Sequence, residues 1–246
     1  MGSPKILVVI PTLNDDPTDT INSIHRQTVK NSKILVAVGS KNLYRKLIVN
    51  KSDDVEVFYI KPNYAEPVGK RVAIALNFVL SKVRLKDYDY LLRVDADTLL
   101  PKRFIEDNLK VDVDYVGKAG YAMLIKMESF TKFFNGRFVE VGAEDSYFGL
   151  KLLSQGRSVK PWTLPPKLKR KSGVAHSWRY YFVRGKEMYK LGYEPIHVFE
   201  VIRLDPRNVF AVLGYFIGML KRISRYDFAG LVFKTQLRRL IYRKQQ

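Results

Sequence analysis

Four short runs of apolar residues divide the first hundred residues of the chain, and each run ends in polar or turn-forming residues. The runs lie at residues 6–10, 33–38, 55–60 and 90–94. Short apolar runs bounded by turn residues predict buried strands. Helical patterns lie between them: one follows Thr18, and another begins at Gly69 and repeats apolar residues through Leu80. This alternation predicts an α/β domain with right-handed crossovers and a mainly parallel sheet.

Two carboxylates, Asp95 and Asp97, follow the fourth run. Open α/β sheets bind their ligands at the carboxyl ends of the strands, and residues two apart in an extended segment face the same side. Adjacent carboxylates suit Mg²⁺ or Mn²⁺, which completes its coordination shell with substrate phosphates and water. As a bare tripeptide, Asp-Ala-Asp is better explained by a solvated turn. The buried strand before it favours a metal and diphosphate site.

Composition sets the class of protein and the charge of its partners. With 246 residues, of which 46% are hydrophobic, the chain can bury the core of one sizeable domain. The absence of cysteine excludes disulfides and thiolate metal sites and allows a cytosolic setting. The net charge of +19 predicts anionic partners: nucleic acid, an acidic membrane surface or phosphorylated substrates. The longest apolar run, 209–220, is shorter than the roughly 20 residues that span a bilayer.

Four blocks of the chain share their order and spacing with a known family. They read Pro-Thr-Leu-Asn-Asp at 11–15, Ser-Ile-His-Arg-Gln-Thr at 23–28, Gly-Lys-Arg-Val-Ala-Ile-Ala-Leu-Asn at 69–77 and Asp-Ala-Asp-Thr at 95–98. In these blocks the chain resembles the family 2 glycosyltransferases of the GT-A fold, which has a Rossmann-like sheet with helices on both faces. The resemblance implies transfer of a sugar from a nucleotide diphosphate sugar, such as a UDP- or GDP-sugar, with inversion at the anomeric carbon.

The resemblance also assigns residues that bind the donor, namely Pro11, Thr12, Asn14, Asp15, Lys70, Asp95 and Asp97. It implies that Pro11, Thr12 and Asn14 line the base and ribose pocket. Either Asp15 or Asp16 would lie near the base, and Lys70 would lie beside the nucleotide. Asp95 would approach the ribose and the metal, and Asp97 would coordinate the Mn²⁺ or Mg²⁺ that bridges the diphosphate. Many members carry an acidic residue after the second strand, where this chain has Gly39 and Ser40. The choice of nucleotide therefore stays open.

Glu144 and Asp145 lie at the start of a predicted helix that ends at Gly156, with Leu150 and Leu153 expected on its buried side. The macrodipole stabilises carboxylates at a helix start, so a simple capping pair would explain them without any function. In the resembling family this position holds a Glu-Asp pair whose aspartate is the catalytic base. The resemblance therefore implies that Asp145 takes the proton from the acceptor. Before this pair, residues 115–125 indicate paired strand segments around glycine.

Two features follow the Glu-Asp pair. A lone histidine such as His176 is more often structural, but some members place a third metal ligand at this distance, and an imidazole ligand favours Mn²⁺. Residues 160–171 are rich in proline and basic residues and predict a loop. Either this loop closes over the diphosphate or it is a solvated basic loop. Within it, Trp162 either stacks on a sugar or packs against the domain.

The composition changes near residue 200. We therefore expect a catalytic domain over 1–200, with a nucleotide-sugar half to about residue 100 and an acceptor half after it, and a helical extension over 201–246. Asp205 and Pro206 predict a helix start. The helix over 209–220 is apolar nearly all round, and a second helix from Phe228 interleaves apolar residues with Lys and Arg. This pattern predicts helices lying in anionic headgroups. The alternative is a hairpin docked on the catalytic domain or on another subunit of a homo-oligomer.

These observations together predict a metal-dependent inverting glycosyltransferase of the hexosyltransferase type. We expect it at the cytoplasmic face of the cell membrane, with a lipid-linked acceptor or a growing glycan. A polyprenyl phosphate is the alternative acceptor and, being already ionised, it would need no base. A basic nucleic-acid-binding protein is the alternative from another class. The basic residues cluster late and no reader motif is recognisable, so nucleic acid is not an expected partner.

Overall fold

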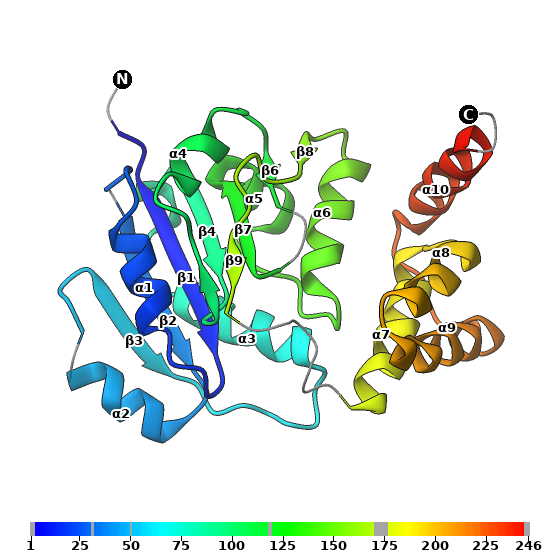
Figure 1. Ribbon diagram of the computed structural model, residues 1–246, viewed down its shortest axis with the longest axis horizontal. Coiled ribbons are helices and arrows are strands. Elements are labelled where there is room, and N and C mark those ends of the chain that lie inside the picture. The colour runs from blue at the N-terminus through cyan, green and yellow to red at the C-terminus, as the bar shows by residue number, and fades with distance from the viewer. Residues whose placement is uncertain (1–2, 31, 50, 118–119, 170–176, 244–246) are drawn as a thin grey trace. The chain divides into compact units, whose positions relative to one another are not determined.

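A computed structural model of the chain describes residues 3–30, 32–49, 51–117, 120–169 and 177–243, except for the side chains of the last five (Figure 1). The chain forms two compact units. The first comprises residues 1–152 and 157–172, and the second comprises residues 153–156 and 173–246. Residues 177–200, which the sequence analysis grouped with the catalytic domain, belong to the second unit.

The first unit is an α/β domain whose elements are β1 (Ile6–Thr12), α1 (Thr18–His25), β2 (Ser32–Val38), α2 (Lys41–Val49), β3 (Val55–Tyr59), α3 (Val68–Leu80), the 3-10 turn Leu85–Asp87, β4 (Tyr90–Val94), β5 (Thr98–Leu99), α4 (Phe104–Leu109), β6 (Tyr115–Val116), β7 (Ala122–Lys126), α5 (Met127–Phe134), α6 (Glu144–Ser154), β8 (Val159–Lys160) and β9 (Lys167–Leu168). Seven strands form one sheet in the order β3-β2-β1-β4-β7-β6-β8. The first four of these are parallel, β7 is antiparallel to both β4 and β6, and β6 and β8 are parallel. The predicted, mainly parallel α/β sheet is thus confirmed.

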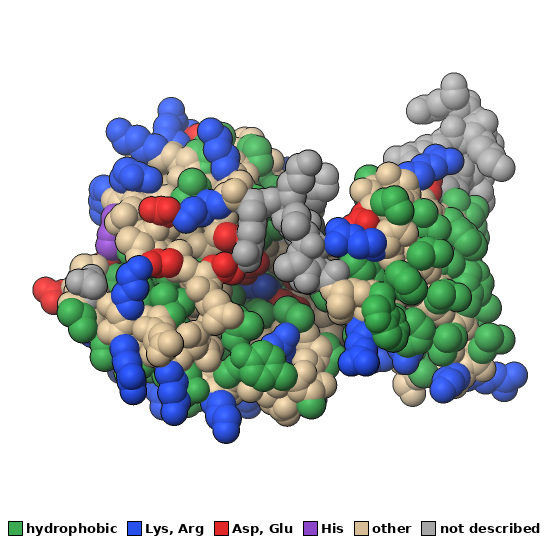
Figure 2. Space-filling view, turned by 60° about the horizontal axis from the view of Figure 1, so that its bottom comes forward, with side chains coloured by type: hydrophobic (Ala, Val, Ile, Leu, Met, Phe, Trp, Pro, Cys, Tyr) green, Lys and Arg blue, Asp and Glu red, His purple; other side chains and the backbone are tan. Residues whose placement is uncertain are grey.

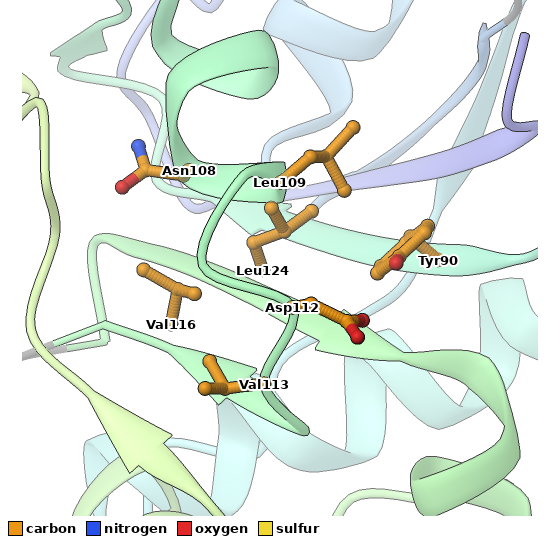
Figure 3. Close-up of a pocket in the computed structure, with 7 residues that line it drawn as sticks. All are labelled: Tyr90, Asn108, Leu109, Asp112, Val113, Val116 and Leu124. Atoms are coloured by element: carbon orange, nitrogen blue, oxygen red, sulfur yellow. The ribbon is translucent and has the colours of Figure 1, made fainter.

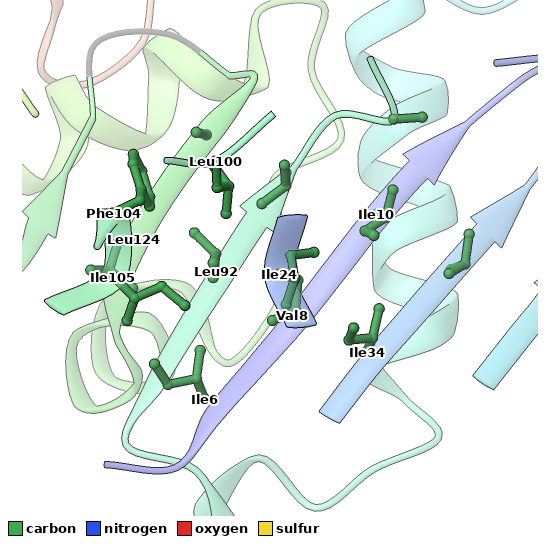
Figure 4. Packing of buried hydrophobic residues seen from close by; sticks show 14 of the residues in the cluster. Ile6, Val8, Ile10, Ile24, Ile34, Leu92, Leu100, Phe104, Ile105 and Leu124 are labelled. Carbon is green, nitrogen blue, oxygen red and sulfur yellow. The ribbon is translucent and has the colours of Figure 1, made fainter. Parts of the chain in front are cut away.

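The core lies on both faces of this sheet because successive strand residues point to opposite sides. On one face Ile6, Val8 and Ile10 pack with residues of α1, α2 and α4, and Figure 4 shows part of this cluster. On the other face Leu7 and Val9 pack with residues of α3, α5 and α6. The central strands are apolar on both sides because both sides are covered, as expected for parallel strands.

The segment 160–171 is not only a loop. Its residues Lys167 and Leu168 form strand β9, which pairs antiparallel with β5. The pairing brings this basic segment next to the turn that carries Asp97, because β5 begins one residue later. Short strands of two residues leave too little periodic pattern to be recognised in the sequence.

The second unit is helical and comprises α7 (Trp178–Leu191), α8 (Pro195–Glu200), the 3-10 turns Val201–Arg203 and Pro206–Asn208, α9 (Val209–Leu220) and α10 (Ala229–Arg243). Helices α7 and α9 cross closely at glycines: a Cβ on Gly185 would overlap the backbone of Ala211, and one on Gly214 would overlap that of Phe182. The side chain of Asp205 accepts a hydrogen bond from the backbone N–H of Arg207, which confirms the predicted helix start. No helix in the described part of the chain combines the length and apolar character needed to cross a membrane.

Candidate active site

The carboxyl ends of β1, β2 and β4 meet at one edge of the sheet because these strands are parallel. Pro11 is buried near the end of β1, Thr12 ends the strand, and Asn14 and Asp15 lie on the loop that follows. The hydroxyl of Thr12 donates to the carbonyl of Asp15 at 2.6 Å, and the N–H of Gly39 after β2 donates to the carbonyl of Thr12 at 2.8 Å. The predicted donor residues of the first strand therefore lie at the same edge as Asp95.

The turn that carries Asp95 and Asp97 is held from several sides. The N–H of Thr98 donates to the carbonyl of Asp95 at 3.0 Å, which closes the turn. The hydroxyl of Thr20 on α1 donates to the carbonyl of Ala96 at 2.7 Å. The N–H of Lys169, just after β9, donates to the carbonyl of Asp97 at 2.9 Å. Anchored in this way from α1 and β9, the turn presents its two carboxylates in a defined position.

Arg93 is the residue that joins this turn to the acceptor half of the domain. It lies on β4 with Leu91 and Asp95 on the same side, facing α3 and α6, and only 4% of it is exposed. Its Nη1 donates to Oε1 of Glu144 at 2.8 Å, and its Nη2 lies 3.4 Å from Oδ1 of Asp95. Its Nε has no partner among the described residues. A buried guanidinium thus bridges carboxylates that lie some fifty residues apart in the chain.

Helix α6 begins at the predicted acidic pair, but its buried side differs from the prediction. Leu153 is half exposed, and the buried residues are Glu144, Phe148 and Leu152. The inward side starts at Glu144, which pairs with Arg93, and continues at intervals of four residues through Phe148 and Leu152, which pack in the core. Gly156 ends this segment with a positive φ of 69°, as predicted.

Asp145 lies beside Glu144 but is partly exposed at the sheet edge. Its Oδ2 accepts a hydrogen bond from the N–H of Gly120 at 3.0 Å, and its Oδ1 accepts one from the N–H of Ser146 at 2.7 Å. A Cβ on Gly120 would lie 3.0 Å from the Asp145 side chain and 3.1 Å from Nη2 of Arg93, so a larger residue would crowd both groups. These contacts leave Asp145 oriented and still accessible.

The start of α3 lies against the same acidic pair. A Cβ on Gly69 would overlap Oε2 of Glu144 and the carbonyl of Gly142, so this helix approaches α6 as closely as glycine allows. The next residue, Lys70, pairs with Glu66 at 2.8 Å. The predicted donor-binding lysine is therefore one residue away from a helix start that touches the acceptor-side carboxylate.

Burial and like charge perturb the titration of these carboxyl groups. Burial raises the pKa of Glu144 to about 7, although the Arg93 guanidinium acts in the opposite direction. Burial, together with the nearby Asp97 and Asp145 carboxylates, raises the pKa of Asp95 to about 6, and Arg93 again opposes the shift. Burial and then the charge of Asp145 raise the pKa of Tyr115. The four predicted carboxylates therefore share one electrostatic site, and Figure 2 shows acidic side chains gathered on this face of the first unit.

The described residues could supply some, but not all, of the ligands of a divalent cation. Among the described residues, no group of three His, Cys, Asp or Glu side chains is arranged to hold a metal ion. His176, the predicted third ligand, lies outside the described residues. Burial first, and then the charge of Asp97, raises the pKa of Asp95, and a hard cation between the two carboxylates would offset both effects. This pair matches a site in which two carboxylates hold the ion and phosphate oxygens and water supply the other ligands.

Two other features are not part of this site. The indole N–H of Trp162 donates to the carbonyl of Ala122 at 2.9 Å and its ring packs on Tyr121 at 5.1 Å, so this tryptophan packs against the domain. Figure 3 shows a small pocket between α4 and strands β4, β6 and β7, lined by Tyr90, Asn108, Leu109, Asp112, Val113, Val116 and Leu124. It lies at the amino-terminal end of β4, and it contains no predicted site residue.

Sequence reasoning missed two residues of the site, Arg93 and Tyr115. A charged residue within the apolar run 90–94 is the signal that could have revealed the first, because a buried strand position tolerates a cation only with a carboxylate partner. The second lies on β6, packs its ring on Phe148 of α6 at 5.9 Å, and brings its hydroxyl close to Gly117. No local pattern distinguishes this tyrosine from an ordinary strand residue.

No protein-family model matches the sequence, and no curated protein matches it. Solved structures do. The mannosyltransferase PcManGT of Pyrobaculum calidifontis, solved in complex with GDP-Man and Mn²⁺, is 18% identical, with a TM-score of 0.57 over 100% of this chain and 84% of that chain. Glucosyl-3-phosphoglycerate synthase of Mycobacterium tuberculosis is 11% identical, with a TM-score of 0.47 over 68% of this chain and 73% of that chain. The first likeness shows that the chain has a fold of the GT-A glycosyltransferase type.

Proposed function

We propose that the chain is a glycosyltransferase that takes a sugar from a nucleotide diphosphate sugar. One observation supports this most directly: Arg93 holds the carboxylates of the β4 turn and of the α6 start together at the carboxyl edge of the sheet. Such an edge is where open α/β folds bind nucleotides. The likeness in fold to a mannosyltransferase agrees with this assignment.

On the donor side, Asp95 and Asp97 would hold Mn²⁺ or Mg²⁺ against the diphosphate. The ion, when bound, neutralises the negative charge that grows on the departing nucleotide. The chain itself supplies the anchoring of the turn through Thr20 and Lys169, so the carboxylates need little rearrangement to meet the donor. Strand β9 of the basic segment lies beside this turn, and there the side chain of Lys169 is paired with Asp19 at 2.6 Å.

On the acceptor side, Asp145 is the group that takes a proton. It is accessible, it lies in the same electrostatic site as Asp95, and the N–H groups of Gly120 and Ser146 orient its two oxygens. A positioned base of this kind contributes roughly 10²–10⁴-fold to the rate. Attack by an acceptor hydroxyl on the face opposite the nucleotide inverts the anomeric carbon. Buried Glu144 would act by holding Arg93 and the start of α6 in position, without touching the acceptor.

The donor assignment is tested by replacing Asp97 and measuring binding and turnover separately. Asp97→Ala is expected to abolish sugar transfer and to remove the Mn²⁺-dependent rise in melting temperature that GDP or UDP produces, because a ligand of the native state stabilises it. Asp87→Ala, which removes an exposed carboxylate of the same unit, is the matched control and should change neither. Full turnover in Asp97→Ala would contradict the assignment.

The class of acceptor is tested at Asp145. Asp145→Asn preserves the shape of the side chain and removes its basicity. Loss of turnover with retained nucleotide binding would indicate a hydroxyl acceptor, on a growing glycan or a lipid-linked sugar. Near-normal turnover would indicate an acceptor that is already ionised, such as a polyprenyl phosphate, and would leave Asp145 only an orienting role.

A further inference from the structure

Helix α9 has one packed side and one exposed side. Its buried residues, Ala211, Gly214, Tyr215 and Gly218, include those at the close crossing with α7. The opposite side carries Val209, Leu213 and Leu220, which lie on one stripe because they are four and eleven residues apart. Leu213 is 51% exposed and Leu220 is 77% exposed. This stripe of exposed leucine is an apolar side of α9 that no described residue covers.

The exposed stripe continues onto α8. The ring of Phe199 on α8 lies 5.8 Å from that of Phe216, which belongs to the same stripe of α9. Phe199 is itself about half exposed, and so is Ile196 one turn earlier. Leu204, in the connection between the two helices, is exposed as well. We call these residues the apolar face: Ile196, Phe199, Leu204, Val209, Leu213, Phe216 and Leu220. Figure 2 shows hydrophobic side chains covering this unit with basic ones beside them.

Basic residues flank the apolar face at both ends. Exposed Arg203 lies next to Leu204, and exposed Lys221 and Arg222 follow Leu220 directly. From residue 178 to 238 the chain carries eleven Lys and Arg against five Asp and Glu. Two of the five acids, Glu200 and Asp205, lie next to residues of the apolar face, and Asp205 is paired with Arg207 at 2.7 Å. The apolar face therefore has basic residues at both ends and belongs to a unit with a net positive charge.

We propose that the apolar face docks on an anionic lipid surface, with α9 lying along the headgroups and the flanking arginines and lysines on lipid phosphates. Exposed apolar area of this kind marks an interaction site, and a basic rim selects for anionic headgroups. A second copy of the chain fits less well, because it would bring the same positive rim against this one. The proposal is independent of the proposed glycosyl transfer, since it concerns binding alone.

The test measures co-sedimentation of the full chain with vesicles of phosphatidylcholine, with and without phosphatidylglycerol. The wild-type chain is expected to bind the mixed vesicles, and to bind less as salt is added. The double variant Leu213→Glu, Leu220→Glu should lose at least tenfold in binding. Its matched control is the double variant Ile48→Glu, Val49→Glu, which places the same two charges on exposed apolar residues of α2 and should bind as the wild type does.

A second pair of variants separates charge from apolar contact. Arg203→Gln with Lys221→Gln should weaken binding to the mixed vesicles roughly tenfold or more, because each basic residue near an anionic surface contributes about fivefold. Exposed Lys86→Gln with Lys102→Gln removes the same charge from the first unit and serves as control. Circular dichroism checks that all variants remain folded.

Three results would overturn the proposal. The first is that wild-type chain does not bind phosphatidylglycerol vesicles at low salt. The second is that the face variants and their controls bind equally, which would assign the binding to net charge alone. The third is a concentration-dependent dimer that Leu213→Glu abolishes, in the absence of any vesicle binding, which would make a second copy the occupant.

Discussion

Replacing Arg93 by methionine should destabilise the first unit strongly, because it leaves the buried carboxylate of Glu144 without its cation. The guanidinium and the Glu144 carboxylate are 2.8 Å apart, and both residues are nearly inaccessible, at 4% and 6% exposure. At an effective dielectric constant of about 20, charges at this separation attract by roughly 6 kcal/mol, part of which offsets the cost of burying them. Breaking a buried pair by removing one partner costs about 3–5 kcal/mol, and we expect Arg93→Met to fall in that range at neutral to alkaline pH.

The loss should depend on pH in a defined direction. The pKa of Glu144 is about 7 in the folded chain and 4.5 without the fold, so the folded state keeps the extra proton between these values and loses stability as the pH rises through them. Without Arg93 the pKa of Glu144 in the folded chain rises further, so the pH range over which the folded state loses stability extends to higher pH. The difference in unfolding free energy between wild type and Arg93→Met should therefore grow by about 1.4 kcal/mol per unit of additional shift as the pH rises above 7, and shrink near pH ~5.

Urea unfolding at pH ~5 and at a pH above 7, followed by circular dichroism, measures these differences in unfolding free energy. Arg84→Met is the matched control, since it breaks an exposed ion pair with Asp87 at 3.0 Å and should cost under about 1 kcal/mol. Adding Glu144→Leu to Arg93→Met should restore part of the lost stability by removing the orphaned carboxyl. A cost below about 1 kcal/mol for Arg93→Met, or one that does not change with pH, would refute the reasoning.

Three other changes test the surrounding structure. Gly69→Ala should cost about 1–3 kcal/mol in urea unfolding, because its Cβ would overlap the carbonyl of Gly142 and the Glu144 carboxylate; unchanged stability would show that α3 can move away. Phe148→Ala should cost about 3–5 kcal/mol, since this ring is 1% exposed and stacks on Phe134 at 3.9 Å; a melting temperature like that of the wild type would contradict the packing. Burial acts to raise the pKa of Asp114, but hydrogen bonds from Ser129, Ser158 and Arg157 hold this pKa well below its usual value. The ionised Asp114 carboxylate stabilises the fold above about pH 4, and this contribution is lost as the pH falls. Asp114→Asn should therefore be less stable than the wild type at pH ~7, and its unfolding free energy should fall less steeply below pH ~4. An equally steep fall in the variant would count against this role.

The sequence predicted the strands well because they are apolar on both faces and end in turn residues. The runs at 6–10, 33–38 and 55–60 correspond to β1, β2 and β3 within two residues at each end. Helix α2 could not be predicted from the sequence because it buries only Leu43 and Leu47, and two apolar residues do not establish a helical period. The boundary between the two units was harder to predict from the sequence, because the packing of α7 on α9 depends on glycines whose partners lie some thirty residues away.

Within the candidate site, the sequence indicated which carboxylates to consider but not how they are joined. Asp95 and Asp145 each follow a recognisable local signal, namely the end of a strand and the start of a helix. The ion pair of Arg93 and Glu144 spans 51 residues, and no local pattern encodes a contact at that separation. The roles proposed for Asp97 and Asp145 in sugar transfer remain predictions for the experiments described above.

The close approach of α3 to α6 has a consequence for how this chain can vary among its relatives. Position 69 has room for a hydrogen and nothing more, because the space beyond it holds the Glu144 carboxylate. A larger residue at 69 becomes acceptable only if position 144 carries a shorter side chain and the backbone at Gly142 also moves away, and Arg93 then needs a different counterion. In an alignment of related chains, positions 69, 93 and 144 should therefore change as a set.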